Sequence, residues 1–169
     1  MNKEKHVKYE TSLTLRELGF DEQCRAFWKN WNNSICLYDA NRGQAFDYCD
    51  NTILEYKYNT SDETNVAAPT IQMAIDWLCE KYNTYVHVKM QDVNFCKPGW
   101  TFTVYHVYKD EEGRMAHGQP YDNDNVTVYE NFANCADSGI MFACRKIKEQ
   151  THEEAPVISS PIVRKRKND

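Results

Sequence analysis

The chain has 169 residues, of which 41% are hydrophobic and 13% aromatic, and this content supports one hydrophobic core rather than two large ones. Its 25 acidic and 20 basic side chains are intermixed and give a formal net charge of -5, so no domain-wide positive field exists to attract a phosphate backbone. Composition therefore disfavours a nucleic-acid partner.

The ends of the chain predict its location and its domain limits. The polar start lacks the apolar segment of a secretory signal, and no stretch approaches the roughly 20 apolar residues of a membrane span. We therefore expect a cytoplasmic protein with no membrane partner. We also expect a flexible N-terminus over residues 1–10, a single domain over residues 11–150, and a disordered basic tail over residues 151–169.

The first third of the chain predicts a short helix followed by strands. Thr11 or Ser12 suits the helix cap and Gly19 its stop. Between residues 25 and 58, aromatic and β-branched runs separated by Asn, Asp and Gly predict two to four short strands. Residues 60–65 are polar and predict a loop.

The middle of the chain predicts a helix that runs directly into a strand. Pro69 suits the first helical turn and Asn83 provides the stop. Apolar side chains recur three and four residues apart between them, at Ile71, Ala74, Ile75, Leu78 and Tyr82. Residues 85–89 then alternate, so that Val86 and Val88 share the buried face of a strand.

The strongest strand pattern is Trp100–Tyr108, and its alternation predicts that His106 lies at the edge of the core, on the same face as Val104. Residues 110–113 predict an exposed turn, after which a polar loop is expected to reach Asn125. A short strand is expected over residues 126–129.

The last predicted element is a helix that Asn131 caps. Its buried stripe is expected to comprise Phe132, Cys135, Ala136, Ile140, Ala143, Cys144 and Ile147. Gly139 interrupts this stripe, and a glycine within a helix indicates a close approach to the sheet. The elements together predict the α+β class: a mainly antiparallel sheet packed against two longer helices, with a short N-terminal helix.

Four segments occur in the order LRELGFDEQC, APTIQMAIDWLCEKYNTYVHV, WTFTVYHVY and YENFANCADSGIMFACRKIKE, and they span most of Leu13 to Glu149. This order resembles that of a group of small phage and mobile-element proteins of gut bacteria. Such proteins typically have proline where this chain has Gln23, and their last helix opens near Tyr-Glu-Glu-Ala. No function is assigned to the group. The resemblance therefore implies an origin and a fold only, and no residue inherits a catalytic role from it. For a protein of such origin, the cytoplasm expected above is that of the host cell.

Motifs for chemistry are weak. The seven cysteines include no CxxC pair, which favours reduced thiols in the core, and we expect no metal site and no cofactor. A hydrolytic site would have to be assembled by the fold, for example from Cys96, His106 and an aspartate.

The excess of aromatic residues indicates binding instead. Trp28 and Trp31 flank Lys29 in polar surroundings, which is typical of a rigid contact surface, although Trp28 would equally suit the core. With Arg25 they would also suit single-stranded nucleic acid, a reading that the acidic balance disfavours. The full set of candidate binding residues comprises Arg25, Trp28, Lys29, Trp31, His87 and Trp100.

Three functions follow from these patterns. The first is stoichiometric binding to a host protein or a small ligand by an accessory protein of a phage or mobile element. The second is a virion-associated or assembly protein that forms a homo-oligomer through exposed strand edges. The third is an enzyme with a Cys and His site assembled by the fold.

Overall fold

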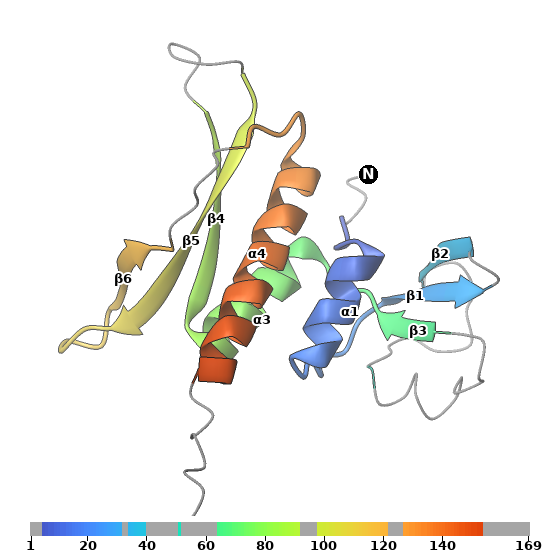
Figure 1. Ribbon diagram of the computed structural model, residues 1–169, viewed down its shortest axis with the longest axis horizontal. Helices are drawn as coiled ribbons and strands as arrows, with labels where there is room; N and C mark the ends of the chain where they lie inside the picture. Colours follow the sequence, from blue (N-terminus) through green and yellow to red (C-terminus); the bar gives the residue numbers. More distant parts are fainter. Residues whose placement is uncertain are drawn as a thin grey trace, which may run out of the picture.

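Three helices and six strands make up the described part of the chain in this computed structural model, which covers residues 5–31, 34–39, 51, 64–91, 98–121 and 127–153 (Figure 1). In chain order they are α1 (Tyr9–Glu17), β1 (Ala26–Trp31), β2 (Ser34–Asp39), β3 (Thr64–Ala67), α3 (Ile71–Tyr82), β4 (Thr84–Met90), β5 (Trp100–Lys109), β6 (Met115–Pro120) and α4 (Phe132–Glu153). The strands form two antiparallel sheets of three, β2-β1-β3 and β4-β5-β6. The predicted α+β class is confirmed.

The smaller sheet contains one strand that the sequence did not predict. β1 and β2 are two of the short strands expected between residues 25 and 58, and they pair antiparallel, with Trp31 opposite Ser34. β3 pairs antiparallel with β1, although residues 60–65 were predicted as a polar loop. Pairing with β1 and the burial of Val66 outweigh the polar character of this segment, because strand preference depends on tertiary context. The other strand runs predicted before residue 58 lie outside the described residues.

The start of the chain makes more contacts than its composition suggests. His6 forms an antiparallel bridge with Thr70, and Val7 is fully buried. α1 begins at Tyr9, two residues before the predicted cap, and the Lys8 backbone N–H donates to Asp137 Oδ1 of α4 at 2.7 Å. Residues 5–10, expected to be part of a flexible segment, thus join α1 to the rest of the fold.

The unit formed by α3 and β4 is close to its prediction. The Thr70 side chain, rather than Pro69, lies at the helix start and accepts the Met73 N–H at 3.2 Å. Asn83 adopts the left-handed conformation with φ 52° and ends the helix. β4 then alternates as expected, with Val86 buried and the residues on either side of it exposed.

The larger sheet also differs from the prediction at its far edge. β6 occupies residues predicted as loop, and it pairs with β5 through a register shift between Tyr105 and Val107. His106 lies opposite Thr84, on the face that Val104 shares, but it is exposed. The end of β5 diverges to the side of α3 and α4 (Figure 1), which leaves His106 exposed, so its predicted place at the edge of the core is wrong.

Helix α4 covers one face of the larger sheet, with α3 beside it (Figure 1). The Asn131 side chain caps it as predicted, accepting the Asn134 N–H at 2.9 Å. The predicted stripe from Cys135 to Ile147 is buried, whereas Phe132 is 36% exposed. None of the described helices is both long enough and apolar enough to span a membrane.

Gly139 lies where α4 packs closely against the sheet. A Cβ atom at this position would lie 2.6 Å from Cγ1 of Val86 and 3.0 Å from Cγ of Phe102. Both distances are shorter than ordinary van der Waals contact. The close approach that the sequence predicted for this glycine is confirmed.

We expect Gly139→Ala to lower the free energy of unfolding by about 1–3 kcal/mol, because overpacking outweighs the better helix propensity of alanine. Chemical denaturation measures the effect. Asn134→Ala, at an exposed position of the same helix, is the control and should change stability by about 0.5 kcal/mol or less. Unchanged or increased stability of Gly139→Ala would contradict the close contact.

Candidate functional site

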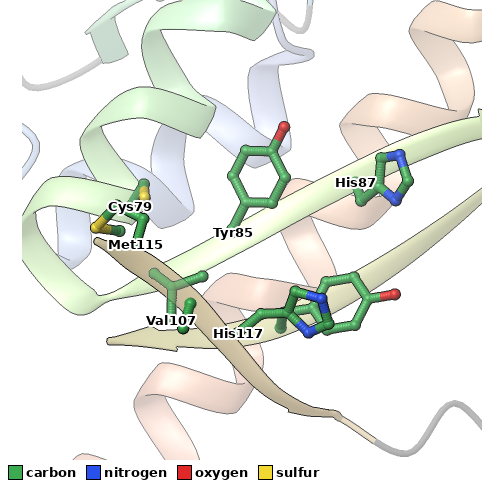
Figure 2. Close-up of a pocket in the computed structure, with 8 residues that line it drawn as sticks. Cys79, Tyr85, His87, Val107, Met115 and His117 are labelled. Atoms are coloured by element: carbon green, nitrogen blue, oxygen red, sulfur yellow. The ribbon is translucent and has the colours of Figure 1, made fainter. Parts of the chain in front are cut away.

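The face of the larger sheet opposite α4 carries a hollow of about 580 Å³, which we call the open-face hollow (Figure 2). Strands β4, β5 and β6 supply most of its lining, and the end of α3 supplies the remainder. The lining residues are Cys79, Tyr85, His87, Tyr105, Val107, Met115, Ala116 and His117. None of these side chains is acidic, lysine or arginine.

The alternation of β4 and β5 places the rings of the hollow. Val86 points toward α4, so its neighbours Tyr85 and His87 point to the open face, where Tyr85 is 40% exposed. Tyr105 pairs directly with Tyr85 across the two strands. The two tyrosines are therefore cross-strand partners on the same face of the sheet.

β6 brings a second imidazole to this face. The ring of His117 lies 4.6 Å from the ring of Tyr105, centroid to centroid, with an angle of 49° between the planes. His117 Nδ1 lies 3.1 Å from the Gly118 carbonyl oxygen. Because a carbonyl oxygen only accepts, this contact assigns the proton of the neutral ring to Nδ1 and leaves Nε2 as an acceptor.

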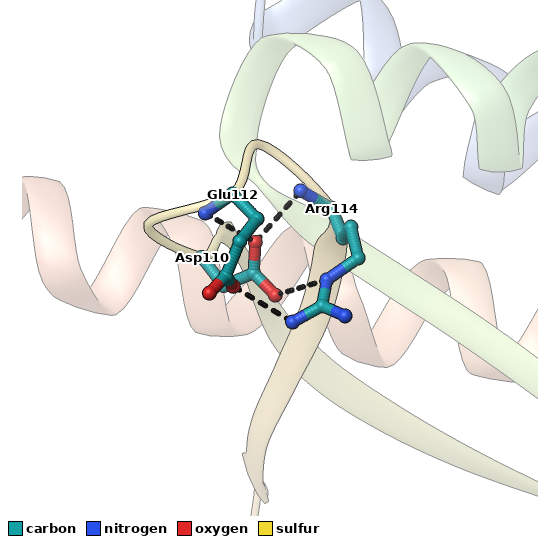
Figure 3. Close-up of polar contacts among 3 residues, drawn as sticks. All are labelled: Asp110, Glu112 and Arg114. Atoms are coloured by element: carbon teal, nitrogen blue, oxygen red, sulfur yellow. Dashed lines mark hydrogen bonds and ion pairs between the residues drawn. The ribbon is translucent and has the colours of Figure 1, made fainter.

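A tight turn sets the position of β6 (Figure 3). Asp110 Oδ1 accepts the backbone N–H groups of Glu112 at 3.1 Å and Arg114 at 2.8 Å. The Arg114 guanidinium also forms ion pairs with the side-chain carboxylates of Asp110 and Glu112. Gly113 has φ +78°, a conformation that favours glycine. This turn, which the sequence predicted, places Met115 and His117 on the hollow.

Cys79 and the imidazoles occupy different ends of the hollow. Figure 2 shows Cys79 beside Met115, with His87 and His117 farther along the strands. Burial raises the pKa of the Cys79 thiol, and the nearby carboxylates of its own helix raise it further. A thiol with a raised pKa is a poor nucleophile at neutral pH. In the described part of the chain, no group of three or more His, Cys, Asp or Glu side chains is arranged to hold a metal ion.

Two other cysteines belong to the core. Burial raises the pKa of Cys135 to about 11 and that of Cys144 to about 12, which agrees with their expected packing role. Cys96, which the sequence analysis considered with His106, lies outside the described residues.

The tryptophan candidates do not gather at the hollow. The Trp28 indole N–H donates to the Val7 carbonyl oxygen at 3.1 Å, so this half-buried ring connects β1 to the start of the chain. Arg25 is exposed and Lys29 half-buried, and both have partners within the protein. The side chain of Trp31 lies outside the described residues.

Of the six candidate binding residues, His87 lines the open-face hollow. Trp100, at the start of β5, is half-buried and packs edge to face on Phe132 with ring centroids 5.3 Å apart. The alternation of side chains along a strand predicted that His87 lies on the outer face. The same alternation, applied to Tyr85 and Tyr105, would have placed these two tyrosines on that face as well. His117 gave no such signal, because its strand was predicted as loop.

A second, smaller hollow of about 390 Å³ lies between α1, α4 and β5. Its buried carboxylate, Asp137, accepts the Lys8 N–H described above and also lies 3.9 Å from the Lys8 ammonium. This carboxylate holds the start of α1 against α4, which is a structural role.

Comparison with known proteins leaves the site to be interpreted from its own geometry. No protein-family model matches the chain, and no curated protein or solved structure matches it.

The turn that places β6 should respond to acid. The hydrogen bond from the Arg114 backbone lowers the pKa of Asp110 below its ordinary value of 3.8. The stabilisation that the carboxylate gives is therefore complete above that value and is lost as the pH falls through the lowered pKa.

We expect the Arg114 amide resonance, followed by NMR, to titrate with a midpoint below 3.8, and we expect this titration to disappear in Asp110→Asn. Glu111→Gln, in the same exposed turn, is the control and should leave the titration in place. A midpoint at or above the ordinary value would show that the turn lacks these hydrogen bonds in solution.

Proposed function

We propose that this chain is a small binding protein that acts by stoichiometric contact and holds a small ligand in the open-face hollow. The observation that carries the proposal is the hollow itself, in which tyrosine and histidine rings line one exposed sheet face. Its volume of about 580 Å³ falls within the range of roughly 300–1,000 Å³ that is typical of small-molecule sites.

Unused hydrogen-bonding groups support a ligand at this position. The hydroxyl groups of Tyr85 and Tyr105 and the ring nitrogens of His87 form no hydrogen bond within the described structure. These groups lie on strands that pair along their length, so the backbone that carries them is fixed before a ligand arrives. Polar groups beside apolar ring surface are typical of small-molecule recognition.

The chemistry of the hollow favours binding over catalysis. The raised pKa of Cys79 opposes formation of a thiolate, and no hydrogen bond joins its sulfur to an imidazole in the described structure. At the open-face hollow, binding therefore has more support than a Cys and His site, whereas the Cys96 and His106 pair stays untested because Cys96 lies outside the described residues.

The biological setting is part of the proposal. The resemblance of the four sequence segments supports an accessory protein of a phage or mobile element, acting in the host cytoplasm. The absence of a membrane-spanning helix among the described residues is compatible with that location. A host protein that covers the same face is the alternative partner.

A second candidate function is self-assembly through the smaller sheet. β2 lies at the edge of the described β2-β1-β3 sheet, and it exposes 45% of Ile35 and 37% of Leu37. An exposed edge strand with apolar side chains pairs readily with another strand. The occupant that fits this edge is β2 of a second copy, which would give the homo-oligomer of an assembly protein.

For the binding function, we expect a library of small aromatic compounds to contain members that shift the NMR resonances of Tyr85, Tyr105 and His117 saturably at one site. Tyr85→Leu should weaken such binding about tenfold, because about 1.4 kcal/mol of ring contact is lost. Tyr108→Leu, an exposed position of β5 outside the hollow, is the matched control and should bind normally.

A library that leaves every hollow resonance unchanged would contradict ligand binding. Capture of a host protein that Tyr85→Leu abolishes would identify the alternative partner at the same face.

For self-assembly, we expect sedimentation to show a concentration-dependent dimer that Ile35→Lys abolishes by placing like charges across the paired edge. Lys29→Arg, on the neighbouring strand, should leave the dimer intact because it keeps the charge. A strict monomer at all concentrations, absent from purified virus particles, would exclude the assembly function.

A further inference from the structure

We infer that the open-face hollow takes an uncharged planar heteroaromatic ring of the nucleobase class, with a free nucleoside as its complete ligand. This inference rests on the proposed function, because it names the class of small molecule that the same site would hold. Three features of the lining support it: the paired phenols, the edge donors and acceptors, and the absence of a phosphate-binding group.

The surface for stacking comes from the paired phenols together with His117. Tyr85 and Tyr105 are direct cross-strand partners on one face of the sheet. The ring contact lies between Tyr105 and His117, whose centroids are 4.6 Å apart, and Tyr85 borders the same hollow. A flat ligand ring gains contact against such a surface whatever its substituents, since every base has a π-face.

The rim supplies hydrogen bonds of both kinds to the edge of such a ring. His117 Nε2 is an acceptor because Nδ1 points its proton at the Gly118 carbonyl. Each of the two phenol hydroxyls can both donate and accept a hydrogen bond. The imidazole of His87 adds two more ring nitrogens that can take part in hydrogen bonds. Nucleobase edges carry N–H donors next to carbonyl and ring-nitrogen acceptors, which is the complement of this set.

The charges around the hollow disfavour a phosphate. No lysine or arginine is among the described residues that line it, whereas phosphate groups are held in proteins mainly by those side chains and by backbone amides. At the Cys79 end of the hollow, the negative charges of Asp76 and Glu80 raise the pKa of the thiol, and the same charges would repel a phosphate. The formal net charge of -5 acts in the same direction. The fitting ligand is therefore a nucleoside or base, in preference to a nucleotide or a nucleic-acid strand.

Titration of the full chain with adenosine, guanosine, cytidine and uridine, and with their 5′-monophosphates, tests the inference by calorimetry and NMR. At least one nucleoside should bind at a 1:1 ratio and more tightly than its monophosphate. Tyr105→Leu should weaken that binding about tenfold, whereas Tyr105→Phe keeps the stacking ring and should retain most of it. His117→Phe should also weaken it, since the ring remains but the Nε2 acceptor is lost.

Tyr108→Leu is the control for a general effect on the sheet, and its binding should equal that of the wild type. Tyr85→Leu serves in place of Tyr105→Leu if the latter fails to fold. The inference is overturned if no nucleoside binds, if a monophosphate binds at least as tightly, or if the leucine variants bind normally.

Failure of this inference is distinguishable from failure of the proposed function. If the nucleosides leave the hollow resonances unchanged while other aromatic compounds shift them, the ligand class is wrong and the binding function stands. If neither set shifts them, both fall.

Discussion

The contact between α4 and the larger sheet is the constraint on which the rest of this structure depends. Gly139 allows the helix to lie against Val86 and Phe102, where a methyl group would already be too close. This packing makes one face of β4 and β5 the core. Because side chains alternate along a strand, it also sends Tyr85 and Tyr105 to the opposite face, where no described helix covers them. Core packing and the candidate site are thus two consequences of one contact.

The remainder of the hollow comes from the far edge of the sheet. The Asp110 turn returns the chain as β6, and a register shift in the β5-β6 pairing accompanies this return. Such irregularities increase the local twist of a strand and redirect its side chains. His117 reaches the ring of Tyr105 by this route. An exposed turn, held by charge-assisted hydrogen bonds, therefore helps to shape the proposed binding surface.

The start of the chain is held by two distant elements. The Trp28 indole N–H of the smaller sheet donates to the Val7 carbonyl oxygen, and the Asp137 carboxylate of α4 accepts the Lys8 backbone N–H. A ring used in this way contributes to stability rather than to an exposed recognition surface. The recognition surface that we propose lies instead on the larger sheet, where the hydroxyl groups of Tyr85 and Tyr105 and the ring nitrogens of His87 have no hydrogen-bond partner among the described residues. Its uncharged lining agrees with a small neutral ligand.

The sequence by itself determined α3, α4, β4 and β5, the buried stripes of α3 and of α4 from Cys135 to Ile147, and the tight contact at Gly139, because caps and hydrophobic periodicity are local signals. Tertiary structure alone decided that β3 and β6 are strands, since each depends on pairing with a partner distant in the chain. It also decided that Trp28 is used internally and that His117 joins the tyrosines. A hollow exists only where several strands meet, and the pairing that brings them together leaves no periodic trace in a short polar segment such as residues 115–120.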